Sequence, residues 1–341
     1  MYRNKHVAVV VPAYNEGGFV GEVIETVPDF VDRVYAVDDR STDGTWDEIC
    51  ESADRMNASD RVDTPLADGG QGDDAFVVPI RHEQNTGVGG AIKTGYRRAY
   101  ADGMDAVAVM NGDGQMDPAI LDRILDPVVS GRADYAKGNR LARGTDRRGM
   151  PPVRLFGNLL LSLLTKIASG YWRMLDPQNG YTAVSRRALE TLEIDELYDQ
   201  YGFANDVLIR CNAAGLRVAD VPMRARYGDE RSHIRMSTFV PSVSRLLLSG
   251  LLWRLRTRYL VFDFHPLVAL FPLALFGLAS GLLGAGAVAL GVGTAGDGAV
   301  ARTLVLAVVG ISAVLFSTGL LLDRHASDPL WVHVEEEVGP R

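Results

Sequence analysis

Two long uncharged apolar stretches near the C-terminal end constrain the fold of this 341-residue chain most. Residues 266–291 and 303–322 contain no Asp, Glu, Lys or Arg, and each reaches the ~20 residues that a helix needs to cross a bilayer. The alternative, a pair of buried core helices, is disfavoured because long uncharged runs are rare in soluble cores. Since the connector between the runs is short, the sequence predicts a transmembrane hairpin over 261–323, followed by a tail over 324–341.

The residues in and around the hairpin predict how it lies in a membrane. Small residues recur in the first run, which favours close helix packing within the hairpin or in a homo-oligomer: Gly277, Gly281, Gly284 and Gly286. Arginines and interfacial aromatic residues precede this run: Trp253, Arg254, Arg256, Arg258 and Tyr259. The connector carries only Asp297 and Arg302 as charged residues. Because basic residues collect on cytoplasmic flanks, we expect a multi-pass protein of the cell membrane whose large N-terminal domain and tail are cytoplasmic.

Residues 1–235 alternate between short β-branched runs and helical patterns. The expected strands are Val7–Val11, Val34–Val37, Phe76–Ile80, Ala106–Met110 and Val218–Val221. The expected helices are Val20–Val27, Trp46–Ala53, Ala91–Ala101, Ile120–Val129 and Ala204–Ala214. This alternation predicts an α/β domain with helices on both faces of the sheet. An acidic, glycine-containing segment at about 54–76 is expected to be a surface insertion.

Composition excludes several classes of protein. With 43 acidic and 35 basic residues the net charge is −8, which argues against a nucleic-acid partner. Two cysteines, Cys50 and Cys211, cannot form a disulfide framework, and no cluster has zinc-ligand spacing. The basic residues are 31 Arg and 4 Lys, and few lysines with excess acid are typical of a high-salt, archaeal source.

Two further apolar segments are expected to lie at the membrane surface. The first, Leu155–Ile167, is short for a span, and Arg154 and Lys166 flank its apolar residues. The second, 236–260, contains the apolar stretch Phe239–Leu255. Amphipathic helices of this kind lie in the headgroup plane. An ordinary core-facing helix is the alternative for each, and the nearby spans favour the membrane surface.

Four polar motifs follow the expected strands in order: Val11–Glu16, Val37–Thr45, Asn85–Ala91 and Asn111–Pro118. Since carboxyl ends of strands are where open α/β sheets bind ligands, we expect a site there. Tyr14 and Glu16 suit a base and a ribose, and Asp39 can accept hydrogen bonds from either. Asp43 is favoured as a structural helix cap. The glycines of the third motif permit close backbone approach, to a ligand or to packed protein.

The fourth motif offers oxygen ligands to a hard cation. Asp113 and Gln115 alternate along a segment that is expected to be extended, so both side chains would point to one side. Oxygen donors suit Mg²⁺ or Mn²⁺. A simple turn is the alternative for an isolated Asp-Gly-Gln sequence.

In this order and spacing, the four motifs resemble family-2 glycosyltransferases of the GT-A fold, over residues 5 to about 235. The resemblance implies a nucleotide-diphosphate sugar donor, a divalent cation and inversion at the anomeric carbon. It implies donor contacts from Pro12, Tyr14, Glu16, Val37, Asp39, Asn111, Gly112 and Asp113. Asp113 and Gln115 would bind the metal together with Asn111, which stands where the family usually has Asp and so removes one negative charge.

Later motifs resemble the dolichyl-phosphate mannose synthase branch: Gly138-Asn139-Arg140, Arg154 with Asn158, Asp176–Tyr181, Asn205-Asp206 and Val221-Pro222. This branch glycosylates a polyprenyl phosphate, and many members carry a C-terminal membrane anchor. The resemblance implies a GDP- or UDP-hexose donor, a polyprenyl (dolichyl) phosphate acceptor and supply of lipid-linked sugar for protein glycosylation. The expected acceptor-phosphate residues are Arg140, Arg154, Asn158, Arg226, Arg231 and Ser232. His233 stands where a basic residue often follows the serine.

The expected mechanism needs no general base, because a lipid phosphate is already anionic. Arginine forks would bind that phosphate and screen it from the donor, so the candidate catalytic residues are Asp113, Asp206, Arg140 and Arg154. Asp206 would orient the acceptor or the sugar, or be a buried structural carboxylate. If the acceptor were a lipid or glycan hydroxyl, Asp206 would be the base. A second alternative is an inactive, membrane-tethered sugar-nucleotide-binding protein, which only Asn111 supports.

Overall fold

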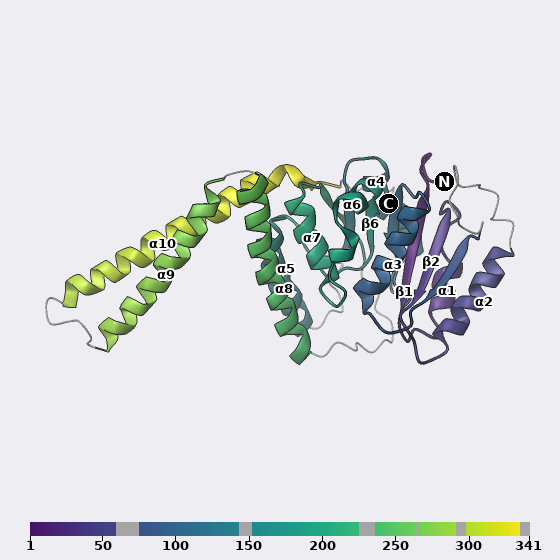
Figure 1. Cartoon of the computed structure of the whole chain (residues 1–341), viewed down its shortest axis with the longest axis horizontal. Coiled ribbons are helices and arrows are strands. Elements are labelled where there is room, and N and C mark those ends of the chain that lie inside the picture. The colour runs from purple at the N-terminus through teal and green to yellow at the C-terminus, as the bar shows by residue number, and fades with distance from the viewer. Residues whose placement is uncertain (59–74, 143–151, 225–235, 263–264, 291–297, 335–341) are drawn as a thin grey trace.

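The computed structural model of the chain describes residues 1–58, 75–142, 152–224, 236–262, 265–290 and 298–334. An α/β domain occupies one end of the molecule, and a pair of long helices projects from the other (Figure 1). Most of the predicted acidic insertion lies outside the described residues. So do three acceptor-phosphate candidates, Arg226, Arg231 and Ser232, together with His233.

Within the described residues, eight strands form one sheet in the order β3-β2-β1-β4-β6-β5-β7-β8. Their bounds are β1 Val7–Ala13, β2 Arg33–Asp38, β3 Val77–Arg81, β4 Ala106–Val109, β5 Tyr135–Asn139, β6 Thr182–Ser185, β7 Val218–Pro222 and β8 Trp331–Val332. Strand β6 runs antiparallel to β4 and β5, and the other neighbours are parallel. The central strands β1 and β2 are buried along their whole length, as their runs of Val and Ala predict.

Helices cover both faces of the sheet. On one face lie α1 (Val20–Glu25), α2 (Thr45–Asn57) and α4 (Leu121–Val129), which is preceded by the short helix η2 (Pro118–Ile120). On the other face lie α3 (Val88–Ala101), α6 (Arg186–Thr191) and α7 (Phe203–Ala213), with the short helix η3 (Ile194–Glu196) before α7. The predicted α/β class and the five predicted helices of this domain are confirmed.

Three strands were not predicted, and each lacks the signal on which the prediction rested. Strand β5 contains Lys137, Gly138 and Asn139 among its five residues, so it carries no β-branched run. Strand β6 contains a single Val among its four residues, and β8 is only two residues long. Each of the five predicted strands contains at least two residues of Val or Ile, and four of them lie between two neighbouring strands.

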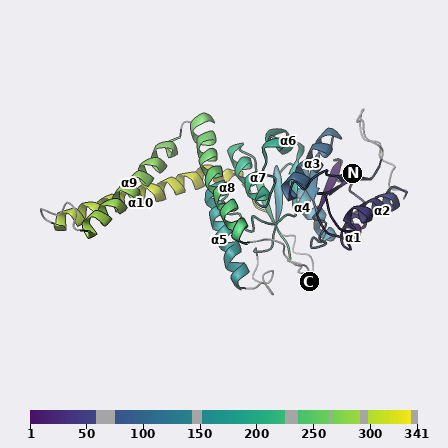
Figure 2. The ribbon, with the colours of Figure 1, turned by 60° about the horizontal axis from the view of Figure 1, so that its bottom comes forward.

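Two helices, α5 (Pro152–Ser169) and α8 (Met236–Arg256), stand side by side between the sheet and the projecting pair (Figures 1 and 2). They pack on each other and on α7. Their exposed surface includes several large apolar side chains: Leu159, Leu160, Leu163, Leu164, Val240, Leu248, Leu252 and Trp253. This surface, called here the α5–α8 apolar face, matches the two segments that were expected at a membrane surface.

The projecting pair consists of α9 (Leu267–Ala289) and α10 (Gly298–Ser327), which lie along each other. Both are long and apolar enough to cross a membrane. Three glycines of α9 face α10: a Cβ at Gly277 would lie 2.0 Å from Ser312 Oγ, one at Gly281 2.5 Å from Val309 and one at Gly284 3.0 Å from Val305. The small residues are therefore used for close packing inside the hairpin.

The base of the hairpin is fixed to the α/β domain by a buried ion pair. Arg254, at the end of α8, donates to both carboxylate oxygens of Asp323 in α10, at 2.8 and 3.1 Å. The hydroxyl of Tyr259, in the π-helical turn Thr257–Phe262, donates to Asp323 as well. Arg254 and Tyr259 are both buried, so they are not the exposed flanking charge and interfacial anchor that the sequence suggested. Arg256 remains exposed.

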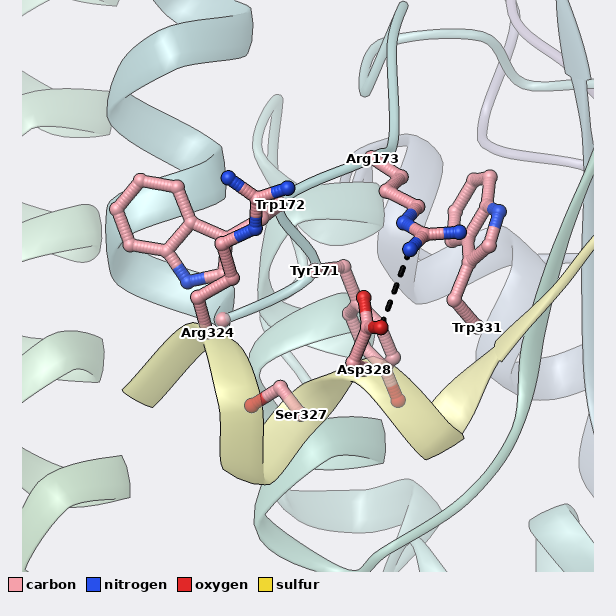
Figure 3. A pocket seen from close by; sticks show the side chains of 8 residues that line it. Tyr171, Trp172, Arg173, Arg324, Ser327, Asp328 and Trp331 are labelled. Carbon is pink, nitrogen blue, oxygen red and sulfur yellow. Dashed lines mark hydrogen bonds and ion pairs between the residues drawn. The ribbon is translucent and has the colours of Figure 1, made fainter. Parts of the chain in front are cut away.

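The chain beyond the second apolar helix returns to the sheet. Helix α10 continues to Ser327, a turn of 3₁₀ helix spans Asp328–Leu330, and β8 pairs with β7. Figure 3 shows this junction, where Arg173 forms an ion pair with Asp328 at 3.1 Å. The predicted tail thus begins within a helix and contributes a strand to the domain.

Candidate active site

The loop after β1 is held against the loop after β2 by side-chain hydrogen bonds. The amide of Asn15 donates to Ser41 Oγ, and the amide of Glu16 donates to Thr45 Oγ1. Asn15 adopts a left-handed φ of 58°, which Asn tolerates better than most residues. The adjacent Tyr14 remains 47% exposed at this edge. The loop therefore presents a fixed backbone and an accessible aromatic ring.

Asp43 is a structural residue in this arrangement. Its Oδ1 accepts from the amide of Thr45 at 3.0 Å, and its Oδ2 accepts from the amide of Gly17 at 3.2 Å. Burial acts to raise the pKa of Asp43, but hydrogen bonds from Thr45 and Gly17 hold it below its ordinary value. The N-cap residue of α2 is Gly44, so Asp43 is not the cap itself. It has a structural role as the acceptor of the first amide of the helix.

Asp39 lies at the end of β2 and orders the loop that leads into α3. Its carboxylate accepts from the amides of Thr86 and Gly87 at 2.8 and 2.7 Å, and it contacts His82 Nδ1 at 2.8 Å. Burial acts to raise the pKa of Asp39, but these hydrogen bonds hold it below its ordinary value. Only 2% of the surface of Asp39 is exposed. Its carboxylate is therefore engaged by the loop that leads into α3.

Two other donor candidates reach the site only through their backbone. Pro12 and Val37 are partners in the β1–β2 register, and both are buried. The side chain of Val37 belongs to the hydrophobic core under α3. Its predicted contact with a nucleotide therefore cannot involve its side chain. The carbonyl of Pro12 accepts from the amide of Gly112 at 3.0 Å, which brings the first and fourth motifs together.

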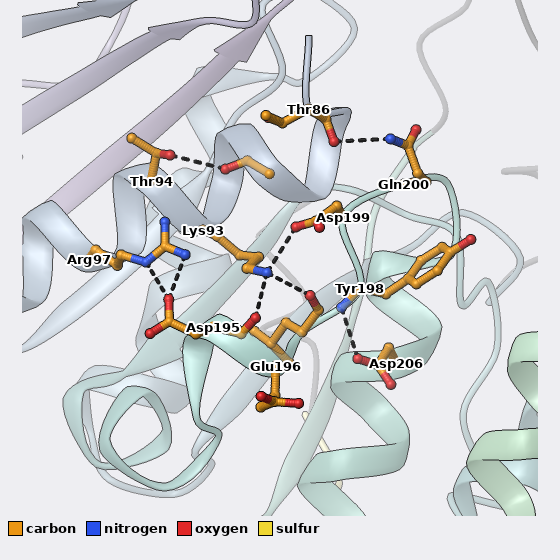
Figure 4. Close-up of polar contacts among 12 residues, drawn as sticks. Thr86, Lys93, Thr94, Arg97, Asp195, Glu196, Tyr198, Asp199, Gln200 and Asp206 are labelled. Atoms are coloured by element: carbon orange, nitrogen blue, oxygen red, sulfur yellow. Dashed lines mark hydrogen bonds and ion pairs between the residues drawn. The ribbon is translucent and has the colours of Figure 1, made fainter. Parts of the chain in front are cut away.

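The glycines at the start of α3 allow a protein segment, residues 198–200, to pack closely. A Cβ at Gly89 would lie 2.3 Å from the carbonyl oxygen of Tyr198, and one at Gly87 would lie 2.7 Å from that of Asp199. Gln200 also donates to the carbonyl of Thr86 at 3.0 Å (Figure 4). Of the two interpretations left open, the structure shows protein packing.

Lys93 holds this segment, and the residues just before it, by hydrogen bonds. Its ammonium donates at 2.8 Å to the carbonyls of Asp195 and Leu197 and to Asp199 Oδ1, as Figure 4 shows. The segment ends beside Tyr201, which is 49% exposed. Burial raises the pKa of the Tyr201 hydroxyl, and the charge of Glu16 adds to this shift.

The predicted metal motif forms a tight turn rather than an extended segment. Gly114 has a φ of 70°, and the amide of Gln115 donates to Asp113 Oδ1 at 3.0 Å. Burial raises the pKa of Asp113, and the charge of Arg140 partly opposes this shift. The Oδ1 atom of Asn111 is buried without a hydrogen-bond partner. Within the described residues, no group of three or more His, Cys, Asp or Glu side chains is placed to hold a metal.

Arg140 follows β5 and faces Asp176 in a bidentate ion pair. Its Nε and Nη2 donate to the two carboxylate oxygens at 2.7 and 2.9 Å, and its backbone amide donates at 3.0 Å. Burial acts to raise the pKa of Asp176, but Arg140 and Lys137 hold it below its ordinary value of 3.8. The segment that Asp176 begins packs on the fourth motif, because Gly180 approaches Asn111 and the hydroxyl of Tyr181 donates to the carbonyl of Asp117 at 3.0 Å.

Asp206 lies in the first turn of α7 and is engaged by protein. Its Oδ2 accepts from the amide of Tyr198 and from Arg210 Nε, both at 3.0 Å. Burial raises the pKa of Asp206, and Arg210 partly opposes the shift. The carboxylate thus helps to hold the segment that also contacts α3 (Figure 4). The neighbouring Asn205 bridges Thr165 of α5 and Gln178.

Two candidates, Arg154 and Asn158, lie in the first half of α5, and the structure does not describe their side chains. Sequence reasoning missed the buried lysines Lys93 and Lys137, and it missed Asp220, which pairs with Lys137. The chain has only 4 lysines, and two of them are buried. In so lysine-poor a sequence, a lysine within an apolar segment was a usable signal.

Comparisons with known proteins agree with this geometry. A family model described as glycosyl transferase family 2 matches residues 8–193. The UDP-N-acetylglucosamine–dolichyl-phosphate N-acetylglucosaminyltransferase of Methanococcus voltae is 29% identical over 66% of this chain and 87% of its own length. The polyprenol monophosphomannose synthase of Mycolicibacterium smegmatis is 30% identical over 63% of this chain and 75% of its own length.

A solved structure is also similar. The glucosyl-3-phosphoglycerate synthase of Mycobacterium tuberculosis, in complex with Mn²⁺ and UDP-glucose, superposes with a TM-score of 0.50 at 23% identity. The match covers 74% of this chain and 79% of that chain, and it supports the GT-A-like fold. Since the family model spans more than half of the sequence, the chain belongs to glycosyl transferase family 2 and is an enzyme of that family.

Proposed function

We propose that this enzyme transfers a hexose from a nucleotide-diphosphate sugar to a polyprenyl phosphate at the cytoplasmic surface of the membrane, with inversion at the anomeric carbon. The lipid-linked sugar would serve protein glycosylation. The observation that carries the proposal is the α5–α8 apolar face, which adjoins the site residues and leads into two helices long enough to span a bilayer. The names of the relatives, which refer to dolichyl, undecaprenyl and polyprenol acceptors, support the same acceptor class.

The donor would bind across the ends of β1, β2 and β4. Tyr14 is exposed for stacking on a base, and Glu16 lies beside it for the ribose. Asp39 fixes the loop that bounds this region. The donor would be a GDP- or UDP-hexose, which a screen of both series can decide.

The residues around Asp113 fit a divalent cation. The turn offers one carboxylate and the unpartnered amide oxygen of Asn111, and Gln115 adds a third oxygen side chain. A hard cation such as Mg²⁺ or Mn²⁺ often takes one or two protein carboxylates and completes its shell with substrate phosphates. Bound there, it would neutralise the departing nucleoside diphosphate.

A substitution tests this assignment. Asp113→Ala and chelation should each lower transfer on the order of 10³-fold, with the fold intact by circular dichroism. Asp122→Ala, which removes a carboxylate from the neighbouring helix α4, is the matched control and should remain active. An enzyme that is indifferent to both chelation and Asp113→Ala would remove the metal from the mechanism.

The acceptor would approach from the α5–α8 side. Its isoprenoid chain would contact the exposed leucines of α5, and its phosphate would meet Arg140 and the arginine at position 154. Arg226, Arg231, Ser232 and Asn158 remain further candidates for that phosphate. A phosphate oxygen is already anionic, so these residues hold it in line with the donor and screen the two negative groups. Asp206, which is bound by the Tyr198 amide and Arg210, orients protein in this scheme.

The decisive experiment uses the full chain in liposomes that contain polyprenyl phosphate. Radiolabelled GDP- and UDP-sugars are supplied, and label is counted in the organic extract. Transfer to this lipid, with Asp206→Asn retaining activity, supports a phosphate acceptor. Label in a hydroxyl-linked lipid or glycan, with Asp206→Asn inactive, would replace the proposal by the alternative in which Asp206 is the base. Binding without transfer would leave a sugar-nucleotide-binding protein.

Membrane topology is tested separately. We expect the chain to sediment with membranes and to resist a carbonate wash at high pH. A reporter at the C-terminus should be cytoplasmic, and one in the 292–302 connector should be external. Release into the supernatant would contradict the anchor.

A further inference from the structure

We propose that Lys137 and Asp220, a buried ion pair between β5 and β7, are positioning residues that hold Arg140 in its place for the acceptor phosphate. This inference rests on the proposed function, because it assigns Arg140 to that phosphate. Neither Lys137 nor Asp220 belongs to the motifs that identify the donor, metal or acceptor sites.

The pair is set by the sheet itself. Lys137 and Asp220 are directly opposite each other in the parallel register of β5 and β7, so their side chains project to the same face. Lys137 Nζ lies 2.7 Å from Asp220 Oδ1, and the two side chains are 0% and 6% exposed. A fully buried charge of each sign is costly unless the geometry of the pair is good and its other polar atoms are satisfied.

Further hydrogen bonds of the pair hold the peptide segment at Leu175 and Asp176. Lys137 Nζ donates to the carbonyl oxygens of Leu175 and Asp176. Asp220 Oδ2 accepts from the amide of Leu175 at 2.9 Å and from Asn139 Nδ2 at 3.0 Å. The cation therefore holds the carbonyl of Leu175 while the anion holds its N–H. This double contact fixes the orientation of the segment that enters Asp176.

The gripped segment has a conformation that needs such support. Asp176 has a φ of 50°, a left-handed value that non-glycine residues rarely adopt and that persists only where surrounding contacts determine it. In this conformation its carboxylate meets the guanidinium and backbone amide of Arg140 through three hydrogen bonds. Asn179 Nδ2 lies 3.3 Å from the same carboxylate.

The chain of contacts ends at the site. Lys137 and Asp220 orient Leu175, Leu175 leads into Asp176, and Asp176 aligns Arg140. The same segment continues to Gly180 and Tyr181, which pack against Asn111 and bond to the carbonyl of Asp117. Apolar residues of similar volume often stabilise a core as well as a buried ion pair does, so core stability alone gives no reason for charges here. Delivery of a rigid guanidinium beside the metal turn does give one.

The test is a double-mutant cycle in the liposome assay with the full chain. Asp220→Asn keeps the shape of the side chain and removes its charge, and we expect it to lower kcat/KM for polyprenyl phosphate about 10-fold. Arg140→Ala should lower it about 100-fold. If the pair acts through Arg140, the double variant should match Arg140→Ala at about 100-fold. The dissociation constant of the nucleoside diphosphate should stay unchanged throughout.

A matched control separates positioning from general loss of stability. Arg33 and Asp102 form an ion pair with a similar burial, 4% and 6%, at 2.9 Å. Arg33 is the first residue of β2. This pair therefore lies at the amino ends of the parallel strands, whereas the site lies at their carboxyl ends. Asp102→Asn should lower the unfolding temperature without changing kcat/KM for the acceptor. A loss of about 1000-fold in the Asp220→Asn/Arg140→Ala double variant, the product of the single effects, would overturn the proposal.

A second measurement needs no acceptor, so it still decides if the proposed function fails. In protein labelled with ¹⁵N-arginine, the Nε–H signal of Arg140 is assigned by its absence in Arg140→Lys. This proton is bonded to Asp176, so it should exchange slowly with solvent, and exchange should quicken in Asp220→Asn and in Lys137→Met but not in Asp102→Asn. Unchanged exchange in folded Asp220→Asn would refute the positioning role. A wild-type enzyme that labels no polyprenyl phosphate would refute only the acceptor.

Discussion

Two bidentate arginine–aspartate pairs, one at the base of the hairpin and one after β5, differ in their access to water. In the pair at the hairpin base, Arg254 and Asp323 are 1% and 2% exposed. Arg254 also donates to the carbonyls of Ala168 and Ile167 and to Asn212. In the pair at the site, Asp176 is equally buried, but Arg140 is 21% exposed. The first pair is closed to water, and the guanidinium of the second remains partly open to it.

The comparison indicates that exposure, more than pairing, determines whether a paired arginine can still bind an anion. A closed guanidinium with protein acceptors around it can only join the elements that supply them, here α5, α7, α8 and α10. A guanidinium aligned by one carboxylate and open on another side can still bind an anion. Sequence analysis treated Arg254 as a flanking charge and Arg140 as a phosphate ligand, and the structure changes only the first assignment.

The largest expected effect is on stability at the closed pair. Arg254→Met leaves the Asp323 carboxylate buried without its main partner, which typically costs about 3–5 kcal/mol of unfolding free energy. Arg140→Met should cost only about 1–2 kcal/mol, because the Asp176 carboxylate keeps its hydrogen bonds from the backbone amide at position 140 and from Asn179 Nδ2. Urea unfolding of the two variants in the same detergent measures the difference. Equal losses would break the comparison.

The next effect concerns activity and the arginine in the first turn of α5. Arg154→Ala should lower transfer to polyprenyl phosphate about 30- to 1000-fold, since the loss of a charged hydrogen bond costs roughly 2–4 kcal/mol. Donor binding should hardly change. Arg154→Lys should restore only part of the activity, because a point charge cannot form the bidentate fork. A parallel loss of nucleotide-sugar binding would move Arg154 to the donor site.

A smaller effect should appear in the pH dependence of stability at the site pair. The pKa of Asp176 is held below 3.8 in the folded protein, so the ionised pair contributes stability above its unfolded value, about 4. That contribution is lost as the pH falls through the folded pKa. Asp176→Asn should therefore be less stable than the wild type by about 1–3 kcal/mol at pH 7, and the difference should shrink below pH 4. A constant difference from pH 3 to pH 7 would contradict the assignment.

The smallest effect sharpens the description of the metal turn. Asn111→Asp adds a second carboxylate and should tighten Mn²⁺ binding several-fold, as measured by calorimetry with nucleoside diphosphate present. Because the side chain packs against the backbone of Gly180, the gain is limited by the room available there. Weaker Mn²⁺ binding in the variant would show that Asn111 does not face the metal.

The parts of the fold that the sequence predicted are those with a periodic signal. Four of the seven residues of β1 are Val, and α9 is apolar all round. The length and the hydrophobic pattern of these segments were therefore enough to predict them. Strand β5 could not be predicted in this way. Its polar side chains Lys137 and Asn139 are buried by tertiary contacts with β7 and with Leu175 and Asp176, which are distant in the sequence. The role of Arg254 was missed for a similar reason, since Asp323 lies 69 residues away in sequence.

The candidate site shows the same division. The motifs placed Tyr14, Asp39, Asp113 and Arg140 on loops that do meet at one edge of the sheet. They could not distinguish a residue that touches a ligand from one that supports it. The side chain of Val37 packs in the core under α3. The carboxylate of Asp39 accepts hydrogen bonds from the amides of Thr86 and Gly87, in the loop that leads into α3. Burial of a residue in a motif is decided by packing partners that a single sequence does not name.

Strand β8 has a consequence for how the protein is made. Residues 331–332 complete the sheet beside β7, yet they leave the ribosome only after both apolar helices. Until then the edge of β7 is unpaired, and an open strand edge invites association with other chains. The catalytic domain can therefore complete its sheet only after both apolar helices have been synthesised. A chain that stops before residue 331 would carry every motif of the site with the edge of β7 still open.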